Sequence, residues 1–329
     1  MIEKRKKYAV IKITHGSGAE FMAVSVIARE LASVYERLFI ICYNKYFSDS
    51  LASELSNVES FGIDTEPQLM TDVIRNKDDY DLFIDHPYNT GKFALRSDNF
   101  YNAYRELVGL EKRTEWSSKG TKDVPHLNIP DNENIEKFVS DHKKFVIVQF
   151  HGGQNPMLQG PVSYDQNGNP ARPPYVYEEK GLKRHYPLEK AEEVVSMLNK
   201  EGYEVLQYTL SNEPHVKGSI FLQQEQPQLF YYKLAEKADG IITIDSSLQH
   251  LAVHAMKPMV VVWCQTDVGA FGYDNDWTVN LKREYSPVCP LMSGLPDTPI
   301  VSYVSPKEII DAFDKLVAAK SKVSSKEKA

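Results

Sequence analysis

Cysteine and long apolar runs are scarce in this chain. Only three of its 329 residues are cysteines, and no two of them form a Cys-x-x-Cys pair. The sequence therefore predicts no disulfide framework, and a reducing, cytoplasmic compartment is the expected location. No apolar run approaches the roughly 20 residues of a membrane-spanning helix, and the charged residues 1–7 lead into an apolar stretch too short for a secretory signal.

Basic charge is not in excess either. The chain has 38 Lys and Arg residues against 45 Asp and Glu residues, which gives a net charge of -7. This balance argues against a protein that coats nucleic acid, although it permits a local basic groove. The basic residues 4–7 and the Lys-rich residues 320–329 are either solvated ends of the chain or a peripheral contact with the inner face of a membrane.

Strand-like apolar runs alternate with helical patterns along the chain. The strand-like runs, which have the continuous apolar character of buried parallel strands, lie at residues 8–13, 37–43, 81–85, 144–150, 203–209, 240–244 and 259–263. The helical patterns lie at residues 19–34, 48–56, 67–76, 99–107, 131–139, 190–200, 228–237, 247–256 and 307–319. This alternation predicts an α/β fold with two Rossmann-like, doubly wound domains in tandem.

A polar stretch at residues 111–130 indicates where the first domain ends. The expected organisation is an N-terminal domain (1–125), a linker and helix (126–142), a second domain (143–305), a C-terminal helix (306–319) and a disordered tail (320–329). Residues 154–181 are rich in Pro, Gly and Tyr and show no periodicity. A loop of this length is usually functional or mobile, so we interpret it as an insertion.

Ligands of open α/β sheets bind beyond the carboxyl ends of the strands, so the loops after the predicted strands carry the candidate sites. After the first strand, His15-Gly16-Ser17-Gly18 leads into a helix with Glu20 near its start. Glycines there allow the backbone to approach a ligand. The structural alternative is an ordinary tight turn in which Glu20 favours the helix N-terminus.

A second candidate loop begins where the first strand of the second half ends. That strand ends at His151, Gly152 and Gly153, and Lys183 and Arg184 follow the long insertion. Two glycines with a nearby arginine form a candidate diphosphate site, because a guanidinium binds phosphate through its planar fork. A plain loop followed by a solvated basic helix start is the alternative.

A third candidate loop begins at Asp245. Ser246 or Ser247 can cap the next helix, and His250 lies in its first turn, so the helix start is a candidate anion site. Because two anions repel, we expect Asp245 to cap backbone N–H groups or to position a cation. His254 has the spacing of a metal pair with His250, but the glutamate of His-Glu-x-x-His is missing, which favours a packed core residue.

One further motif, Asp274-Asn275-Asp276, has the Asp-x-Asp form that holds a divalent cation in some sugar transferases. It lies among turn-forming residues, so turn chemistry is the favoured interpretation. The sequence contains no Gly-x-Ser-x-Gly elbow and no Walker loop.

In several places the sequence resembles the heptosyltransferases, glycosyltransferase family 9. The family has a strand, Asp-Thr-Gly-x-x-His, a short helix, Lys-Pro and another apolar strand; here residues 245–250 read Asp-Ser-Ser-Leu-Gln-His, followed by Lys257-Pro258 and an apolar run. Residues 184–187 are similar to the family's basic-x-Trp-Pro element, and Cys289-Pro290 to a late Cys-Pro. Residues 18–27 are similar to its first glycine loop and helix, except that Ala19 stands where the family has a catalytic aspartate.

The resemblance implies a GT-B architecture whose first domain binds an acceptor and whose second domain binds a nucleotide-diphosphate sugar. It implies an inverting glycosyl transfer without metal or other cofactor, with an ADP-heptose-like donor as the first candidate and a UDP-sugar as the second. Glu20 is the first candidate for the base and His15 the second, since a histidine titrates near neutral pH whereas a carboxylate needs a raised pKa for this task. The donor-binding candidates are His151, Gly152, Gly153, Lys183, Arg184, Asp245, Ser246, Ser247 and His250.

Two other functions stay open. The replacement of the expected aspartate by Ala19 suits a protein that binds nucleotide sugars without catalysis. A GT-B-like epimerase or hydrolase would instead consume the donor without an acceptor. For a transferase, the expected acceptor is a glycan, as in lipopolysaccharide biosynthesis, with a protein or a modified nucleic acid as less favoured alternatives.

Overall fold

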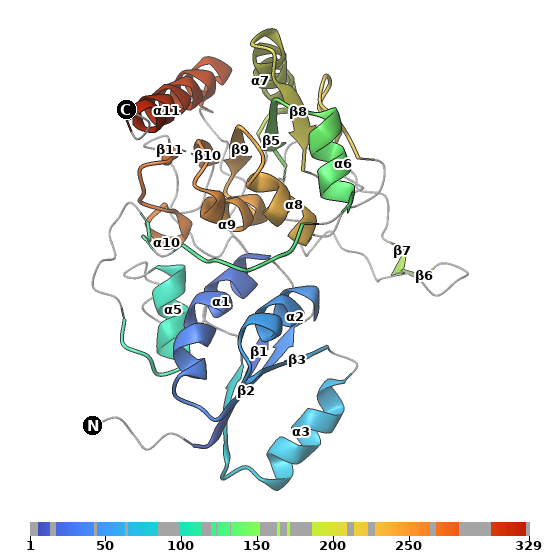
Figure 1. Cartoon of the computed structure of the whole chain (residues 1–329), viewed down its shortest axis with the longest axis vertical. Helices are drawn as coiled ribbons and strands as arrows, with labels where there is room; N and C mark the ends of the chain where they lie inside the picture. The colour runs from blue at the N-terminus through green and yellow to red at the C-terminus, as the bar shows by residue number, and fades with distance from the viewer. Residues whose placement is uncertain are drawn as a thin grey trace, which may run out of the picture. The chain divides into compact units, whose positions relative to one another are not determined.

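The chain folds into two compact units (Figure 1). The structure, a computed structural model, describes residues 6–13, 18–42, 45–62, 65–84, 99–112, 120–122, 124–131, 133–151, 163–164, 170–171, 186–208, 214–222, 228–263, 268–282 and 304–326. Unit 1 holds residues 1–132 and 268–274, and unit 2 holds residues 133–267 and 275–329. The division therefore falls within the predicted linker, whereas the return of residues 268–274 to unit 1 has no counterpart in the predicted organisation.

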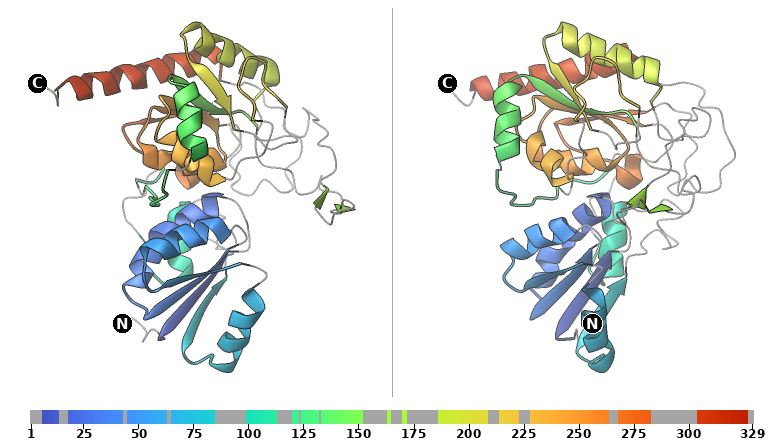
Figure 2. Two further views of the ribbon diagram at one scale, coloured as in Figure 1. Left: turned by 45° about the vertical axis from the view of Figure 1, so that its right-hand side comes forward. Right: turned by 90° about the vertical axis from the view of Figure 1, so that its right-hand side faces the viewer.

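Unit 1 is built on a parallel sheet with the strand order β3-β2-β1-β4. Its strands are β1 (Tyr8–Ile13), β2 (Arg37–Cys42), β3 (Val58–Phe61) and β4 (Tyr80–Ile84), and its helices are α1 (Gly18–Ala32), α2 (Lys45–Glu54), α3 (Glu66–Arg75), α5 (Phe100–Leu107) and α10 (Val268–Phe271). Helices α1 and α2 cover one face of the sheet and α3 covers the other (Figure 2). Leu69 and Val73 of α3 are four residues apart, so they form one apolar stripe that packs on Val10 and Phe39 of the sheet.

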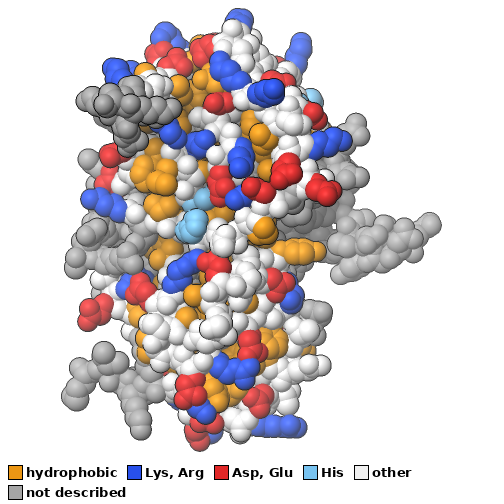
Figure 3. Space-filling model, viewed as in Figure 1, with side chains coloured by type: hydrophobic (Ala, Val, Ile, Leu, Met, Phe, Trp, Pro, Cys, Tyr) orange, Lys and Arg blue, Asp and Glu red, His pale blue; other side chains and the backbone are white. Residues whose placement is uncertain are grey.

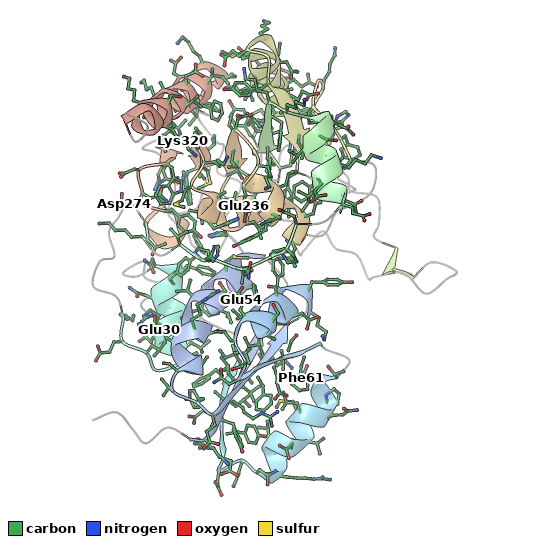
Figure 4. All side chains as sticks on the ribbon, in the orientation of Figure 1. Glu30, Glu54, Phe61, Glu236, Asp274 and Lys320 are labelled. Carbon is green, nitrogen blue, oxygen red and sulfur yellow. The ribbon has the colours of Figure 1, made fainter. Side chains whose placement is uncertain are left out.

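Helix α5 is tied to its neighbours in unit 1 by polar contacts. Asn99 precedes the helix in extended conformation and accepts a hydrogen bond from the Asn102 backbone N–H at 2.9 Å, which satisfies one of the free donors of the first turn. The largely buried Arg105 guanidinium makes a two-pronged ion pair with Glu30 of α1, at 2.6 and 3.1 Å (Figure 4). The Tyr101 hydroxyl lies 2.8 Å from that of Tyr273, which anchors the returning segment 268–274.

Unit 2 contains a second parallel sheet, with the order β11-β10-β9-β5-β8. Its strands are β5 (Phe145–Gln149), β8 (Glu204–Gln207), β9 (Gly240–Ile244), β10 (Met259–Trp263) and β11 (Thr278–Lys282), and the short strands β6 (Ser163–Tyr164) and β7 (Pro170–Ala171) pair with each other inside the predicted insertion. Its helices are α6 (Glu133–Asp141), α7 (Leu188–Lys200), α8 (Gln228–Ala235), α9 (Ser247–Ala252), the 3₁₀ turn η3 (Val253–Ala255) and α11 (Pro306–Lys326). The prediction of two Rossmann-like α/β domains in tandem is confirmed.

Helices α7 and α11 pack on one face of the unit 2 sheet and enclose an apolar cluster. Phe313 of α11 lies against Gly240 at the start of β9, where a β-carbon would overlap the ring, so only glycine fits. The predicted disordered tail is wrong as far as Lys326, because α11 continues to that residue. Lys320 stabilises this extension by donating a hydrogen bond from Nζ to the Met256 carbonyl oxygen at 2.9 Å.

The surface carries charge of both signs. On the face that Figure 3 shows, Lys and Arg side chains are interspersed with Asp and Glu side chains rather than gathered in one stripe. Among the described residues, no helix combines the length and the apolar character that crossing a bilayer requires.

Candidate functional site

The unit 2 sheet reverses its strand order between β5 and β9. After β5 the chain forms β8 on one side of it, and then β9 on the other side. In sheets of this kind the connections leave in opposite directions at that point and open a crevice beyond the strand ends. Gln149 of β5 pairs with Thr243 of β9, so this register brings His151 and Asp245 to the same edge of the sheet. Two of the three predicted loops therefore meet at this edge.

Gln149 links the two strand ends. Its side chain is 3% exposed, and its Nε2 donates to the His151 carbonyl oxygen at 3.0 Å and to Ser246 Oγ at 2.9 Å. Its Oε1 accepts from the Leu248 backbone N–H at 3.3 Å. Gln149 is not among the predicted site residues, although a polar residue within the apolar run 144–150 is a signal that could have identified it.

Ser246 and Ser247 form the turn between β9 and α9. Ser246 occupies the N-cap position, but its side chain makes no capping hydrogen bond, and its Oγ accepts from Gln149. The Ser247 hydroxyl lies 3.2 Å from the hydroxyl of Tyr208, the residue after β8. The expected helix 247–256 is shorter, since α9 ends at Ala252. The capping role predicted for Ser246 is therefore wrong, and a six-residue helix has a weak dipole, so the side chains carry the polarity of this turn.

Asp245 and His250 are joined through Gln249. Asp245 is 4% exposed, and its Oδ1 accepts from Gln249 Nε2 at 2.8 Å. The same Nε2 lies 3.4 Å from His250 Nε2. His250 is buried, and so is Asp245.

His151 is enclosed by the protein, with 1% of its surface exposed. Burial lowers the pKa of its imidazole from 6.5 to about 4, because the charged form loses its hydration. The ring is therefore neutral at neutral pH, and it supplies no positive charge to an anion. Its role in donor binding stays a prediction.

Unit 1 has its own strand-order reversal, between β1 and β4. Glu20 stands in the first turn of α1, which follows the carboxyl end of β1, and its side chain is 8% exposed. The structure thus places Glu20 where a ligand of unit 1 is expected. The remaining candidates lie outside the described residues: His15, Gly152, Gly153, Lys183 and Arg184.

Two features of the sequence resemble metal sites. His254 is 6% exposed, stacks on the Tyr232 ring with a centroid distance of 3.6 Å, and lies 3.5 Å from Glu236 of the same unit (Figure 4). It is a packed residue, as predicted. In the Asp-x-Asp sequence, the Trp277 N–H donates to Asn275 Oδ1 at 3.2 Å, which confirms the turn interpretation. The described part of the chain contains no cluster of three or more metal-binding side chains.

Comparison with known proteins gives matches in structure. No family model matches the sequence, and no curated protein matches it. A family 9 glycosyl transferase from Veillonella parvula has a TM-score of 0.58 at 12% identity, over 97% of this chain and 99% of that chain. The dodecameric iron-containing glycosyltransferase TibC of enterotoxigenic E. coli has a TM-score of 0.61 at 14% identity, over 97% of this chain and 78% of that chain. The E. coli ADP-heptose lps heptosyltransferase II has a TM-score of 0.58 at 11% identity, over 95% of this chain and 99% of that chain.

These likenesses extend over nearly the full length of the chain, and they agree with the resemblance to family 9 seen in the sequence. Both units have the parallel, alternating α/β construction of a GT-B glycosyltransferase. At this level of identity the comparison establishes the fold, and the activity has to be argued from the site.

Proposed function

We propose that this chain transfers a sugar from a nucleotide-diphosphate donor to an acceptor hydroxyl, with inversion at the anomeric carbon. The observation that carries the proposal is the buried polar cluster at the strand-order reversal of unit 2, within a fold that glycosyltransferases share. Neutral hydrogen-bond donors held in place at such a crevice suit an anionic ligand.

In this proposal, unit 2 binds the donor. The hydroxyls of Ser246 and Ser247 and the His250 side chain face the diphosphate, and Lys183 and Arg184 supply positive charge. An ADP-sugar is the first candidate, because a TibC structure with the same fold, at a TM-score of 0.58 and 15% identity, is a complex with ADP-D-β-D-heptose. A UDP-sugar is the second candidate. The acceptor binds to unit 1, and a glycan is the favoured acceptor.

The chemistry consists of one displacement. The Glu20 carboxylate, or His15 as the second candidate, accepts the proton of the acceptor hydroxyl as its oxygen attacks the anomeric carbon. The bond from that carbon to the diphosphate oxygen breaks, and its electron pair leaves with the nucleoside diphosphate. Arg184, Lys183 and the hydroxyl donors of the turn stabilise the developing negative charge, which is the role that a metal ion has in other transferases.

The first test is thermal unfolding of the wild type and of His250→Ala with ADP, UDP, GDP, CDP and dTDP. A ligand at about 100 times its Kd adds roughly 2.7 kcal/mol of stability. We expect one diphosphate, with ADP as the first candidate, to stabilise the wild type and not the variant. If none of the five stabilises the wild type, the donor site is wrongly assigned. If EDTA abolishes sugar transfer, Asp274 and Asp276 become the candidates for a divalent-cation site.

A second candidate function is nucleotide-sugar binding without catalysis, which Ala19 at the position of the expected aspartate favours. It predicts saturable donor binding without turnover against a broad panel of acceptors. A sugar-nucleotide epimerase or hydrolase would consume the donor with no acceptor present. Donor consumption measured with and without acceptors therefore separates the three functions.

A further inference from the structure

Gln149 is a polar side chain in a strand that is otherwise apolar. It lies at the end of β5 with 3% of its surface exposed, among residues that form the unit 2 core. A buried amide is costly unless its donors and its acceptor are all hydrogen-bonded. The three contacts of Gln149 satisfy this requirement, and they all go to the two strand ends that form the candidate donor site.

Two of these contacts fix the orientation of the amide. The Leu248 backbone N–H can only donate, so the Gln149 atom that meets it is the oxygen. The His151 carbonyl can only accept, so the Gln149 atom that meets it is the nitrogen. The second N–H on that nitrogen points to Ser246 Oγ, and Ser246 is therefore the acceptor in this hydrogen bond.

The direction of that bond decides what the Ser246 hydroxyl can do. In that bond the Ser246 oxygen accepts, so the hydroxyl proton is not used there and can be donated to a partner beyond the turn. We infer that Gln149 is a positioning residue of the donor site. It holds the turn from Asp245 to Leu248 against the end of β5, and it directs the Ser246 hydroxyl as a donor toward a diphosphate oxygen. This inference rests on the proposed function, which supplies the diphosphate.

The neighbouring strand provides a matched control. Gln207 of β8 pairs with Val148 of β5 and is 1% exposed. Its Nε2 donates to the Pro214 carbonyl oxygen at 2.8 Å, and its Oε1 accepts from the Val216 N–H at 2.8 Å. Gln207 thus makes comparable bonds to the following loop, and none of its described bonds goes to the Asp245–Leu248 turn.

The experiment compares Gln149→Met with Gln207→Met. Calorimetry measures the affinity for whichever of ADP, UDP and GDP the wild type prefers, and unfolding without ligand measures stability. We expect similar losses of stability, because each variant removes a buried amide with three bonds, the third bond of Gln207 being accepted by Oε1 from the Ser219 hydroxyl at 3.1 Å. Only Gln149→Met is expected to weaken diphosphate binding, by about tenfold, and to raise the KM for the donor without changing the KM for the acceptor.

A second pair of variants keeps the test decisive if Gln149→Met does not fold. Ser246→Thr retains the hydroxyl and is expected to bind as the wild type does, whereas Ser246→Ala loses about tenfold in affinity. Equal diphosphate affinities in the two methionine variants, or in the two Ser246 variants, would overturn the inference and leave the proposed function standing. If the wild type binds none of the diphosphates, the proposed function and this inference both fail.

Discussion

The two sheets reverse their strand order in the same way, but different chemistry lies at the two reversals. In unit 2 the edge carries buried amide and hydroxyl side chains, among them Gln149, Ser246 and Gln249, and Gln249 donates to the buried Asp245 carboxylate. In unit 1 the described residue at the equivalent edge is the carboxylate Glu20, in the first turn of a helix that continues with the buried Phe21 and Met22. Fixed neutral donors suit the binding of an anion, whereas a carboxylate that titrates suits proton transfer.

The largest effect is expected when the carboxylate of unit 1 is removed, which tests the proposed difference between the two units. We expect Glu20→Gln to lower kcat by roughly 10²–10⁴-fold, the usual contribution of a general base. Because the donor is proposed to bind to unit 2, its affinity should stay within about twofold of the wild type. Initial rates and calorimetric titration with the nucleoside diphosphate measure the two quantities.

Glu30→Gln is the matched control, since Glu30 lies on the same helix but pairs with Arg105. It is expected to lose stability and to keep its turnover. Full activity in Glu20→Gln together with an inactive His15→Gln would transfer the role of base to His15. Full activity in both would show that unit 1 supplies its base from elsewhere.

The pH dependence of stability tests whether the buried His151 at the unit 2 edge is neutral. Burial lowers the pKa of His151 from 6.5 to about 4, so between these values the unfolded chain binds a proton that the folded chain does not. The free energy of unfolding therefore falls as the pH drops from about 6.5 to 4, by about 3 kcal/mol over the whole window. Urea unfolding of the wild type and of His151→Gln at several pH values measures this slope.

The variant should be less pH-dependent in that window, because its side chain does not titrate. His215→Gln, at an exposed position, is expected to follow the wild type. An unchanged slope in His151→Gln would mean that the pKa of His151 is the same in the folded and the unfolded chain, and that burial does not keep the ring neutral between pH 4 and 6.5.

If His151 is neutral, the positive charge for the diphosphate has to come from other residues. We expect Arg184→Ala and His250→Ala each to lower turnover by about 100-fold, the cost of removing one preorganised donor at a developing charge. Lys200→Ala makes the same change of charge as Arg184→Ala at an exposed position at the end of α7, and it should leave the rate unaffected. Normal turnover in both Arg184→Ala and His250→Ala would contradict the donor-site assignment.

The sequence predicted the central strands better than the edge strands. The bounds of β9 and β10 agree with the prediction, because strands buried on both faces are continuously apolar. Strands β3 and β11 were missed, and both lie at the edge of the described sheets. The run Val58–Phe61 has two polar residues between its apolar ends and is only partly buried, so its state depends on pairing with β2 rather than on its own pattern.

The same limit applies to the site. The sequence identified the loop at Asp245 by its residue types, but the role of each hydroxyl depends on the register of β5 against β9. That register brings Gln149 to Ser246, whose side chain accepts from Gln149 and makes none of the capping hydrogen bonds that the local sequence suggested. Residues that act through partners far away in the chain are therefore the part of the site that a single sequence cannot predict.

The smallest predicted effect compares two residues at the N-cap position of a helix, one in each unit. Asn99 caps α5 of unit 1, whereas Ser246 stands at the same position of α9 without capping it. Asn99→Ala should cost about 1 kcal/mol in urea unfolding and leave nucleoside-diphosphate affinity unchanged. Ser246→Ala should also cost stability, because it leaves one N–H of the buried Gln149 amide without its acceptor, but unlike Asn99→Ala it should lose affinity. If Ser246→Ala instead keeps its nucleoside-diphosphate affinity, as Asn99→Ala does, then Ser246 has only a structural role. The two strand-order reversals would then differ less in chemistry than their residues indicate.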